Sequence, residues 1–405
     1  MEFRPILSAM LRNKTGAVLV ALQIAFTLAV IVNAVYIVSK RVEKMMRPTG
    51  MDVAHIITAQ VWAVGDNTNI EQMARQDLEV LRAIPGVIDA TVSHQVPLSG
   101  GGWGDDMKAA PGPDDGGKKS VPAARYTVDE HAINTLGVKL EAGRNFRADE
   151  IRYREPNKSQ AIETVIVTRA VAKDLFPDGR DPVGQTAYDD MDRPITIVGI
   201  IEQMHGAWVG WDKLDHVMLS PEIATGPLLR YLVRTEPGQL DNLLPVVEQK
   251  LIERDPNRVV RKVQPMSEIA ARSYEDDRAM AVVLSVVVSL LIIITALGII
   301  GLASFNVKTR TKQIGTRRAV GARKLDIVRY FLLENWMITT FGVVAGAIMA
   351  AGLNYWLVTA YSLDKLNPLF IPAGILGIWF LGLASVLGPA RRAAAIPPAV
   401  ATRTV

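Results

Sequence analysis

The sequence predicts a membrane protein with four transmembrane α-helices, arranged as one plus three, and a large α+β extracytoplasmic domain inserted between helices 1 and 2. Of its 405 residues 49% are hydrophobic, which is too many for an ordinary soluble protein, yet 21% are charged. The two classes are also segregated, because long apolar runs flank one polar region of about 240 residues. A membrane anchor joined to a polar domain explains both observations.

Basic residues are concentrated in the short segments outside the apolar runs, which is the distribution that orients membrane proteins. Residues 39–278 hold 30 Lys and Arg against 37 Asp and Glu, whereas segments 1–15, 306–335 and 389–405 together hold 14 basic residues against 3 acidic ones. Short basic loops stay in the cytoplasm, but long domains are translocated largely regardless of charge. Both chain ends are therefore predicted to be cytoplasmic.

The first elements are an interfacial helix and a span. Residues 1–15 are predicted to form an amphipathic helix on the cytoplasmic face, the alternative being the n-region of a signal sequence. Apolar side chains recur there at helical spacing: Phe3, Ile6, Leu7, Met10 and Leu11. Residues 16–38 form the first span, long enough to cross a core of about 30 Å. Its Gln23 and Asn33 are predicted to be interhelical hydrogen-bond partners.

Residues 39–278 are predicted to form a mixed α+β domain with stalk helices, in two subdomains. Pro194–Ile201 is its clearest strand, whereas Pro97–Lys119 is rich in Gly, Pro and Asp and is predicted to be a mobile loop. Inside that loop, Gly112–Lys119 nearly matches a phosphate-binding loop. Lys119 stands where such loops have Ser or Thr, and we expect no ATP site there.

The remaining spans follow a stalk. Met266–Phe305 is predicted to be one long helix, polar at first and membrane-spanning over 279–305, the alternative being a hinge at the membrane. A cytoplasmic coupling segment (306–335), a third span (336–360), a short exterior loop (361–368), a fourth span (369–388) and a cytoplasmic tail (389–405) complete the chain. Pro389 is predicted to end the last span, and Gly342 and Gly346 form a small-xxx-small pair suited to close helix packing.

No catalytic, cofactor-binding or metal-binding residues are predicted. The chain has no Cys, and its five His residues are not paired at metal-ligand spacing. No acidic residue interrupts the apolar runs, which disfavours an ion-coupled transporter. The chain is predicted to be a non-catalytic subunit that binds no nucleic acid and takes its energy from a partner.

The segment 310–334 reads RTKQIGTRRAVGARKLDIVRYFLLE and resembles the signature of MacB/FtsX-type ABC transporter permeases, RTxEIGxRxAxGA. Other elements of that family follow in the right order: Leu136-Gly137, Gly143-Arg144, the Asp181–Gly184 turn, the Ile197–Ile201 strand and the closing PARRAAAIPPAVATR. The resemblance covers essentially the whole chain, including a MacB-like periplasmic core domain.

The resemblance implies a permease subunit of the type VII, or mechanotransmission, class in the bacterial inner membrane. It implies a dimer of separate ABC ATPase subunits, which bind the ATP, and a second permease subunit, identical or homologous. The lipid bilayer surrounds the spans, and a periplasmic adaptor and an outer-membrane channel are further candidate partners. The expected role is export of a periplasmic substrate; the alternatives are lipoprotein release by the same architecture and an FtsX-like signalling scaffold.

The resemblance assigns ATPase coupling to the segment after the second span. The predicted coupling residues are Arg310, Lys312, Gln313, Ile314, Gly315, Arg317, Arg318, Gly321, Ala322, Arg323 and Lys324. Two positions depart from the family pattern, since Gln313 and Thr309 replace acidic residues. This motivates the hypothesis of a specialised, heterodimeric permease that faces an acidic ATPase groove. The alternative is that the charges serve only topology and anionic lipid.

Overall fold

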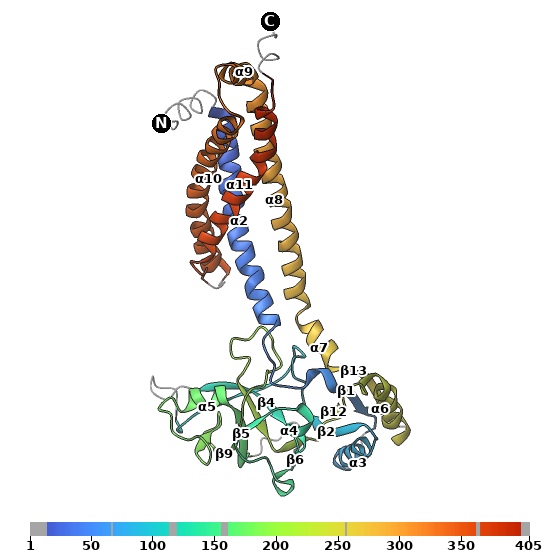
Figure 1. Cartoon of the computed structure of the whole chain (residues 1–405). Helices are drawn as coiled ribbons and strands as arrows, with labels where there is room; N and C mark the ends of the chain where they lie inside the picture. Colours follow the sequence, from blue (N-terminus) through green and yellow to red (C-terminus); the bar gives the residue numbers. More distant parts are fainter. Residues whose placement is uncertain are drawn as a thin grey trace. The chain divides into compact units, whose positions relative to one another are not determined.

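The computed structural model describes residues 14–65, 68–112, 120–154, 161–255, 257–361 and 365–397 (Figure 1). The chain forms two compact units, one of which is Arg47–Glu275 and the other the helices before and after it. Several predictions lie outside the described residues: most of the amphipathic helix 1–15, residues 113–119 of the phosphate-loop-like segment, 362–364 of the short loop and 398–405 of the tail.

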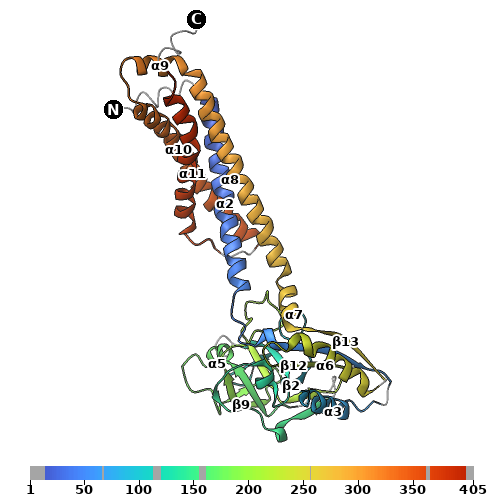
Figure 2. The same ribbon diagram turned by 45° about the vertical axis from the view of Figure 1, so that its right-hand side comes forward.

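The helical unit confirms the predicted membrane architecture. Among the described residues, four of its helices are long and apolar enough to cross a membrane: α2 (Lys14–Met45), α8 (Glu275–Thr309), α10 (Lys324–Tyr361) and α11 (Phe370–Ala394). Half of the α2 span is buried, against 11% of the α8 span. The α2 side chains Ile24, Leu28 and Val32 pack in a core shared with α10 and α11. Helix α2 is thus the centre of the bundle, and α8 runs beside it (Figure 2).

Polar side chains join α2 to its neighbours. Gln23 Nε2 donates to the Ile294 carbonyl of α8 (3.1 Å), and Asn33 Nδ2 donates to the Ala350 carbonyl of α10 (3.1 Å). The prediction that both are interhelical partners is confirmed. Near the other end of α2, Arg41 and Lys44 both pair with Asp277 of α8, whose side chain is buried. Within a span, bonds such as those of Gln23 and Asn33 replace the bonds that water cannot supply.

Two helix boundaries differ from the prediction. The expected continuous helix Met266–Phe305 is divided, because one residue separates the end of α7 (Met266–Ser273) from the start of α8. Tyr274 between them is buried at φ −102° and ψ 13°, so tertiary packing ends the helix without Gly or Pro. Conversely, Pro389 lies inside a helix and does not end it. Helix α11 continues to Ala394, since loss of one amide is offset by burial of Ala390, Ala393 and Ala394.

The first sheet of the large unit is antiparallel with strand order β13-β1-β12-β2. Its strands are β1 (Ile56–Ala63), β2 (Val87–Ser93), β12 (Leu228–Thr235) and β13 (Arg258–Pro265). Alternate residues Ile57, Ala59 and Val61 pack in one core with helices α3 (Ile70–Arg82) and α6 (Leu240–Arg254). The opposite face carries Ile56 and Leu232, which belong to a core shared with the second sheet.

The second sheet is mixed, with the order β3-β4-β10-β7-β9-β5, and β8 pairs with β9. Its strands are β3 (Gly104–Met107), β4 (Val121–Thr127), β5 (Leu140–Gly143), β7 (Thr164–Thr168), β8 (Thr186–Tyr188), β9 (Pro194–Ile201) and β10 (Val217–Ser220). Helix α5 (Arg169–Leu175) contributes to its core. The smaller elements are α4 (Ala132–Leu136), the 3₁₀ helices Val53–His55 and Ala148–Glu150, and the pair β6 (Arg152–Arg154) and β11 (Glu222–Ala224).

One predicted strand is confirmed, and one predicted loop contains a strand. Strand β9 has the predicted bounds, but β3 forms within Pro97–Lys119, which was expected to be a mobile loop. Its residues Gly-Asp-Asp-Met have low strand propensity, so pairing with β4 overrides local preference.

Candidate functional site

A glycine fixes the turn between α9 (Thr311–Ala319) and α10. Gly321 has φ 103°, a conformation that residues with a Cβ rarely adopt. Its amide donates to the Arg318 carbonyl (3.2 Å), and the following Ala322 amide donates to the Arg317 carbonyl (3.0 Å). These two bonds make a Schellman motif that closes α9. The backbone between the two helices therefore has one defined path.

Arg310 is bound inside the helical unit. Its Nη1 donates to Glu334 Oε2 (2.9 Å) and to the Tyr330 hydroxyl (3.1 Å), both on α10. The Glu334 side chain is only 5% exposed. The Arg317 guanidinium lies 5.1 Å from the centre of the Tyr330 ring, within the range of a cation–π contact. Arg310 and Tyr330 thus brace α9 against the first turns of α10.

Arg318 also has a structural partner. Its Nη1 donates to the Ala394 carbonyl at the end of α11. The last carbonyls of a helix lack intrahelical partners and carry partial negative charge, so a guanidinium is favoured there. Arg318 therefore holds the end of α11 against α9.

The other predicted coupling residues divide by exposure. Ile314 and Gly315 are buried, and Ala322 is partly buried. The exposed ones are Lys312, Gln313, Arg317, Gly321, Arg323 and Lys324. Beside them stand two exposed apolar side chains, Val320 at 84% and Leu325 at 76% exposure. We define the turn surface as Lys312, Arg317, Val320, Arg323, Lys324 and Leu325.

The turn surface has a composition suited to binding. It presents four cations around two exposed apolar side chains, and the neighbouring exposed Asp326 accepts a hydrogen bond from the Arg323 amide (2.8 Å). An acidic partner with a small apolar recess would complement it. Over the described residues, no group of three His, Cys, Asp or Glu could hold a metal ion.

Sequence reasoning missed four contributors to this region: Val320, Leu325, Tyr330 and Glu334. A signal was present for the last two, because Tyr330 and Glu334 are spaced i, i+4 and must share one helix face. Exposure of Val320 and Leu325 depends on the turn geometry, which the pattern of hydrophobic residues does not report.

Gly342 and Gly346 of α10 lie against α2. A Cβ added to Gly342 would stand 2.8 Å from the Ala21 carbonyl oxygen, and one added to Gly346 would stand 2.8 Å from that of Ala25. Real Cβ atoms do not approach backbone so closely, so this helix pair requires glycine at both positions.

Two family models match the chain. The model described as MacB-like periplasmic core domain matches residues 18–243, and the model described as FtsX-like permease C-terminal matches residues 285–398. The second match contains α9, the turn surface and both packing glycines.

Curated relatives are longer than this chain. A macrolide export ATP-binding/permease protein MacB of Brucella melitensis is 30% identical over 253 residues, which cover 57% of this chain and 36% of the relative. A probable export ATP-binding/permease protein MacB of Pseudomonas entomophila is 26% identical over 288 residues, covering 67% of this chain and 40% of the relative. The chain therefore spans well under half the length of these two relatives.

Two solved structures also match part of the chain at low TM-score. The periplasmic region of MacB from Actinobacillus actinomycetemcomitans matches with a TM-score of 0.34 and 13% identity, covering 57% of this chain and 98% of that one. The extracellular domain of the noncanonic ABC-type transporter YknZ from Gram-positive bacteria matches with a TM-score of 0.32 and 12% identity, covering 50% and 99%.

Proposed function

Because the chain belongs to the family defined by the MacB-like periplasmic core domain, we propose that it is the permease subunit of an ABC transporter of the bacterial inner membrane. In this proposal the subunit hydrolyses no ATP. An ATPase dimer docks on the turn surface, and closure of the ATPases moves the helical bundle and, through it, the extracytoplasmic domain. The cargo is a periplasmic substrate that is exported, as the names of the curated relatives suggest for those proteins.

The observation that carries the proposal is a contrast within the coupling segment, between residues bonded inside the helical unit and residues exposed on the turn surface. Arg310 and Arg318 are engaged inside the helical unit, which makes α9 part of the bundle. The turn surface, by contrast, leaves its cations exposed around Val320 and Leu325. A force applied there would be transmitted to α10 and α11 through the internal contacts of Arg310 and Arg318.

The division also refines the predicted coupling residues. The proposed direct contacts to the ATPase are Lys312, Gln313, Arg317, Arg323 and Lys324, and Gly321 sets the path of the turn. Ile314, Gly315, Arg310, Arg318 and Ala322 act as supports within the bundle. A second permease subunit, identical or homologous, completes the transporter in this proposal, with the ATP held by the ATPase partners.

Site-specific photo-crosslinking tests the docking. A photo-reactive amino acid is placed at position 320 or 325 of the full chain in its native membrane, and crosslinked products are identified by mass spectrometry. We expect a protein with the nucleotide-binding motifs of an ABC ATPase at both positions. The control is position 380, because Phe380 of α11 is equally exposed at 76% but lies within a predicted span. Crosslinks to lipid alone at positions 320 and 325 would refute the proposal.

A further inference from the structure

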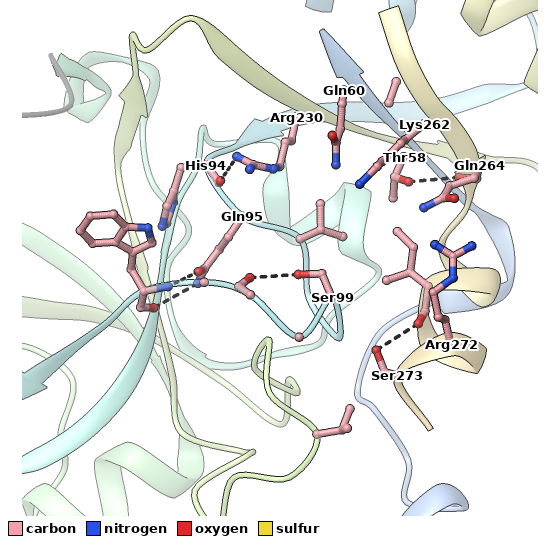
Figure 3. A pocket seen from close by; sticks show the side chains of 18 residues that line it. Thr58, Gln60, His94, Gln95, Ser99, Arg230, Lys262, Gln264, Arg272 and Ser273 are labelled. Atoms are coloured by element: carbon pink, nitrogen blue, oxygen red, sulfur yellow. Dashed lines mark hydrogen bonds between the residues drawn. The ribbon is translucent and has the colours of Figure 1, made fainter. Parts of the chain in front are cut away.

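The large unit contains a polar cavity of about 460 Å³ on the face of the first sheet that lies opposite α3 and α6 (Figure 3). Strand β1 contributes Thr58 and Gln60, and β12 contributes Arg230, which is the register partner of Gln60. The segment Ser99–Trp103 forms another wall. Its path is fixed because the Gln95 side-chain amide donates to the Trp103 carbonyl (3.3 Å) and to the Arg125 carbonyl (2.6 Å). The volume is that of a small-molecule site.

The cavity is lined by cations without counter-charges. Arg230, Lys262 and Arg272 contribute to the lining, and none of the described lining residues is Asp or Glu. Over the described part of the chain, none of these three cations lies within ion-pair distance of a carboxylate. Burial lowers the pKa of Arg230, as expected for a guanidinium without a nearby anion. Elsewhere in this unit buried arginines are paired, as Arg258 is with Asp77 at 2.9 Å.

A backbone irregularity directs Lys262 into the cavity. Strand β13 pairs with β1 as Thr58 with Gln264 but Gln60 with Arg261, so one extra residue is inserted on β13. Lys262 in this bulge has φ 51°, an unfavourable conformation for a residue with a Cβ. In a regular strand Lys262 would share a face with Val260, which packs in the core beneath α6. The bulge instead places Lys262 beside Gln264 on the cavity face (Figure 3).

His94, which also lines the cavity, adds a neutral ring to this region. Its Nδ1 accepts a hydrogen bond from the Thr127 amide (3.2 Å), which leaves the ring proton on Nε2. Burial lowers the pKa of His94 to about 3, with repulsion from Arg125, Arg230 and Arg154 adding to the effect. The neutral ring can thus donate a hydrogen bond without a further charge.

We propose that this cavity binds a small anionic ligand that also carries hydroxyl groups, of the class of sugar phosphates. Lys262, Arg230 and Arg272 would hold the anionic group. Arg230 is half-buried and Lys262 and Arg272 are exposed, and no described lining carboxylate competes with an anion for their charge-assisted hydrogen bonds. The side-chain amides of Gln60 and Gln264 would bind hydroxyls, and the exposed ring of Trp103 offers a face for a sugar ring. The site lies wholly within Arg47–Glu275 and does not rest on the docking proposed for α9 and α10.

Isothermal titration calorimetry of the full chain in detergent tests this proposal with glucose 6-phosphate, inorganic phosphate and glucose as separate probes. We expect saturable binding of glucose 6-phosphate that weakens as salt is raised. Lys262→Gln and Arg230→Gln should each weaken binding by roughly tenfold, the scale of one lost charge-assisted hydrogen bond. Lys173→Gln removes one exposed cation of α5, which is not part of the cavity lining, and should leave binding unchanged.

Lys262→Gly tests the loss of the charge without added backbone strain. Glycine adopts a positive φ readily, so the variant should keep the bulge. It should weaken binding as Lys262→Gln does while leaving thermal stability intact. If inorganic phosphate binds as tightly as glucose 6-phosphate, the anion site is supported and the proposed contacts to the sugar are refuted. The proposal is overturned if no probe binds, if glucose binds as tightly as its phosphate, or if Lys173→Gln weakens binding as much as Lys262→Gln.

Discussion

At the scale of single residues, Gly321 decides the geometry of the turn surface. Gly321→Val should strain the turn, because a β-branched residue at φ 103° is disfavoured by about 1–3 kcal/mol. Gly321→Asn is the matched variant, since Asn tolerates left-handed backbone. We expect the crosslinking yield at position 325 to fall for Gly321→Val and to persist for Gly321→Asn, with little change in thermal stability for either. Equal yields for both would show that the turn geometry is irrelevant to docking.

Glu150 should make the stability of the large unit depend on pH. Arg144 donates two hydrogen bonds to its carboxylate, at 2.7 and 2.6 Å, and these lower the pKa of Glu150 below its ordinary value of 4.5. A carboxyl with a lowered native pKa stabilises the fold above its unfolded pKa, and this contribution is lost as pH falls through the native value. Arg144 of the Gly143-Arg144 motif thus has a structural role, since its bonds to Glu150 join the end of β5 to the 3₁₀ helix Ala148–Glu150.

Thermal unfolding of the full chain in detergent, followed by tryptophan fluorescence, measures this contribution. Wild type should exceed Glu150→Gln in stability at pH 7, and the difference should shrink as the pH falls below 4.5. Glu248→Gln, on an exposed face of α6, controls for the loss of one negative charge. A difference that stays constant down to pH 3 would contradict the assignment.

The sequence predicted the basic character of the coupling segment but not the division of its residues. Arg310 and Lys312 look alike in the sequence, yet one is bound by Glu334 and the other is exposed. The distinction arises because α10 runs back past the start of α9, bringing together residues 24 positions apart. Periodicity within one helix contains no such information.

At the scale of elements, the pairing of α10 with α2 depends on small residues. Gly346→Val should disrupt it, because the added carbon atoms would meet the Ala25 backbone. Gly352→Val is a matched control on the same helix, since nothing lies within 4 Å of a Cβ at Gly352. We expect a clear fall in the thermal midpoint of the detergent-solubilised chain for Gly346→Val only. Similar midpoints for the two variants would argue against close packing at this position.

Helix existence followed from hydropathy, whereas helix ends did not. The third span is predicted to begin at residue 336, and the helix that contains it, α10, begins 12 residues earlier at Lys324. Tyr274 illustrates the reverse case, since it interrupts a segment free of Gly and Pro. Both outcomes depend on tertiary contacts that composition does not encode.

At the scale of the whole molecule, the proposed orientation can be tested on a chain that contains no cysteine. Leu325→Cys and Val64→Cys place single thiols at exposed sites, on the turn surface and next to β1. In intact cells, a membrane-impermeant maleimide that crosses only the outer membrane should label position 64 and not position 325. Position 325 should react after the inner membrane is permeabilised. The opposite labelling would invert the topology and remove the turn surface from the cytoplasm.

The order of strands was the least predictable part of the fold. No local sequence pattern shows that β1 is a central strand flanked by β12 and β13. The same holds for the cavity on this sheet. Its lining includes residues of β1 and β13, the first and the last strand of the large unit in sequence. The bulge at Lys262 is defined only by the register between β13 and β1, which the sequence does not give.

That arrangement has a consequence for biosynthesis. Thr58 of β1 pairs with Gln264 of β13, which is synthesised 206 residues later. Until then one edge of β1 has unpaired amides and carbonyls, and an open edge is a template for pairing with another chain. Because closing so long a loop is slow, nascent chains that stall before Pro265 should be the aggregation-prone species. Only the short helix α7 separates β13, which completes the sheet, from α8, so the domain finishes its first sheet shortly before the second span is synthesised.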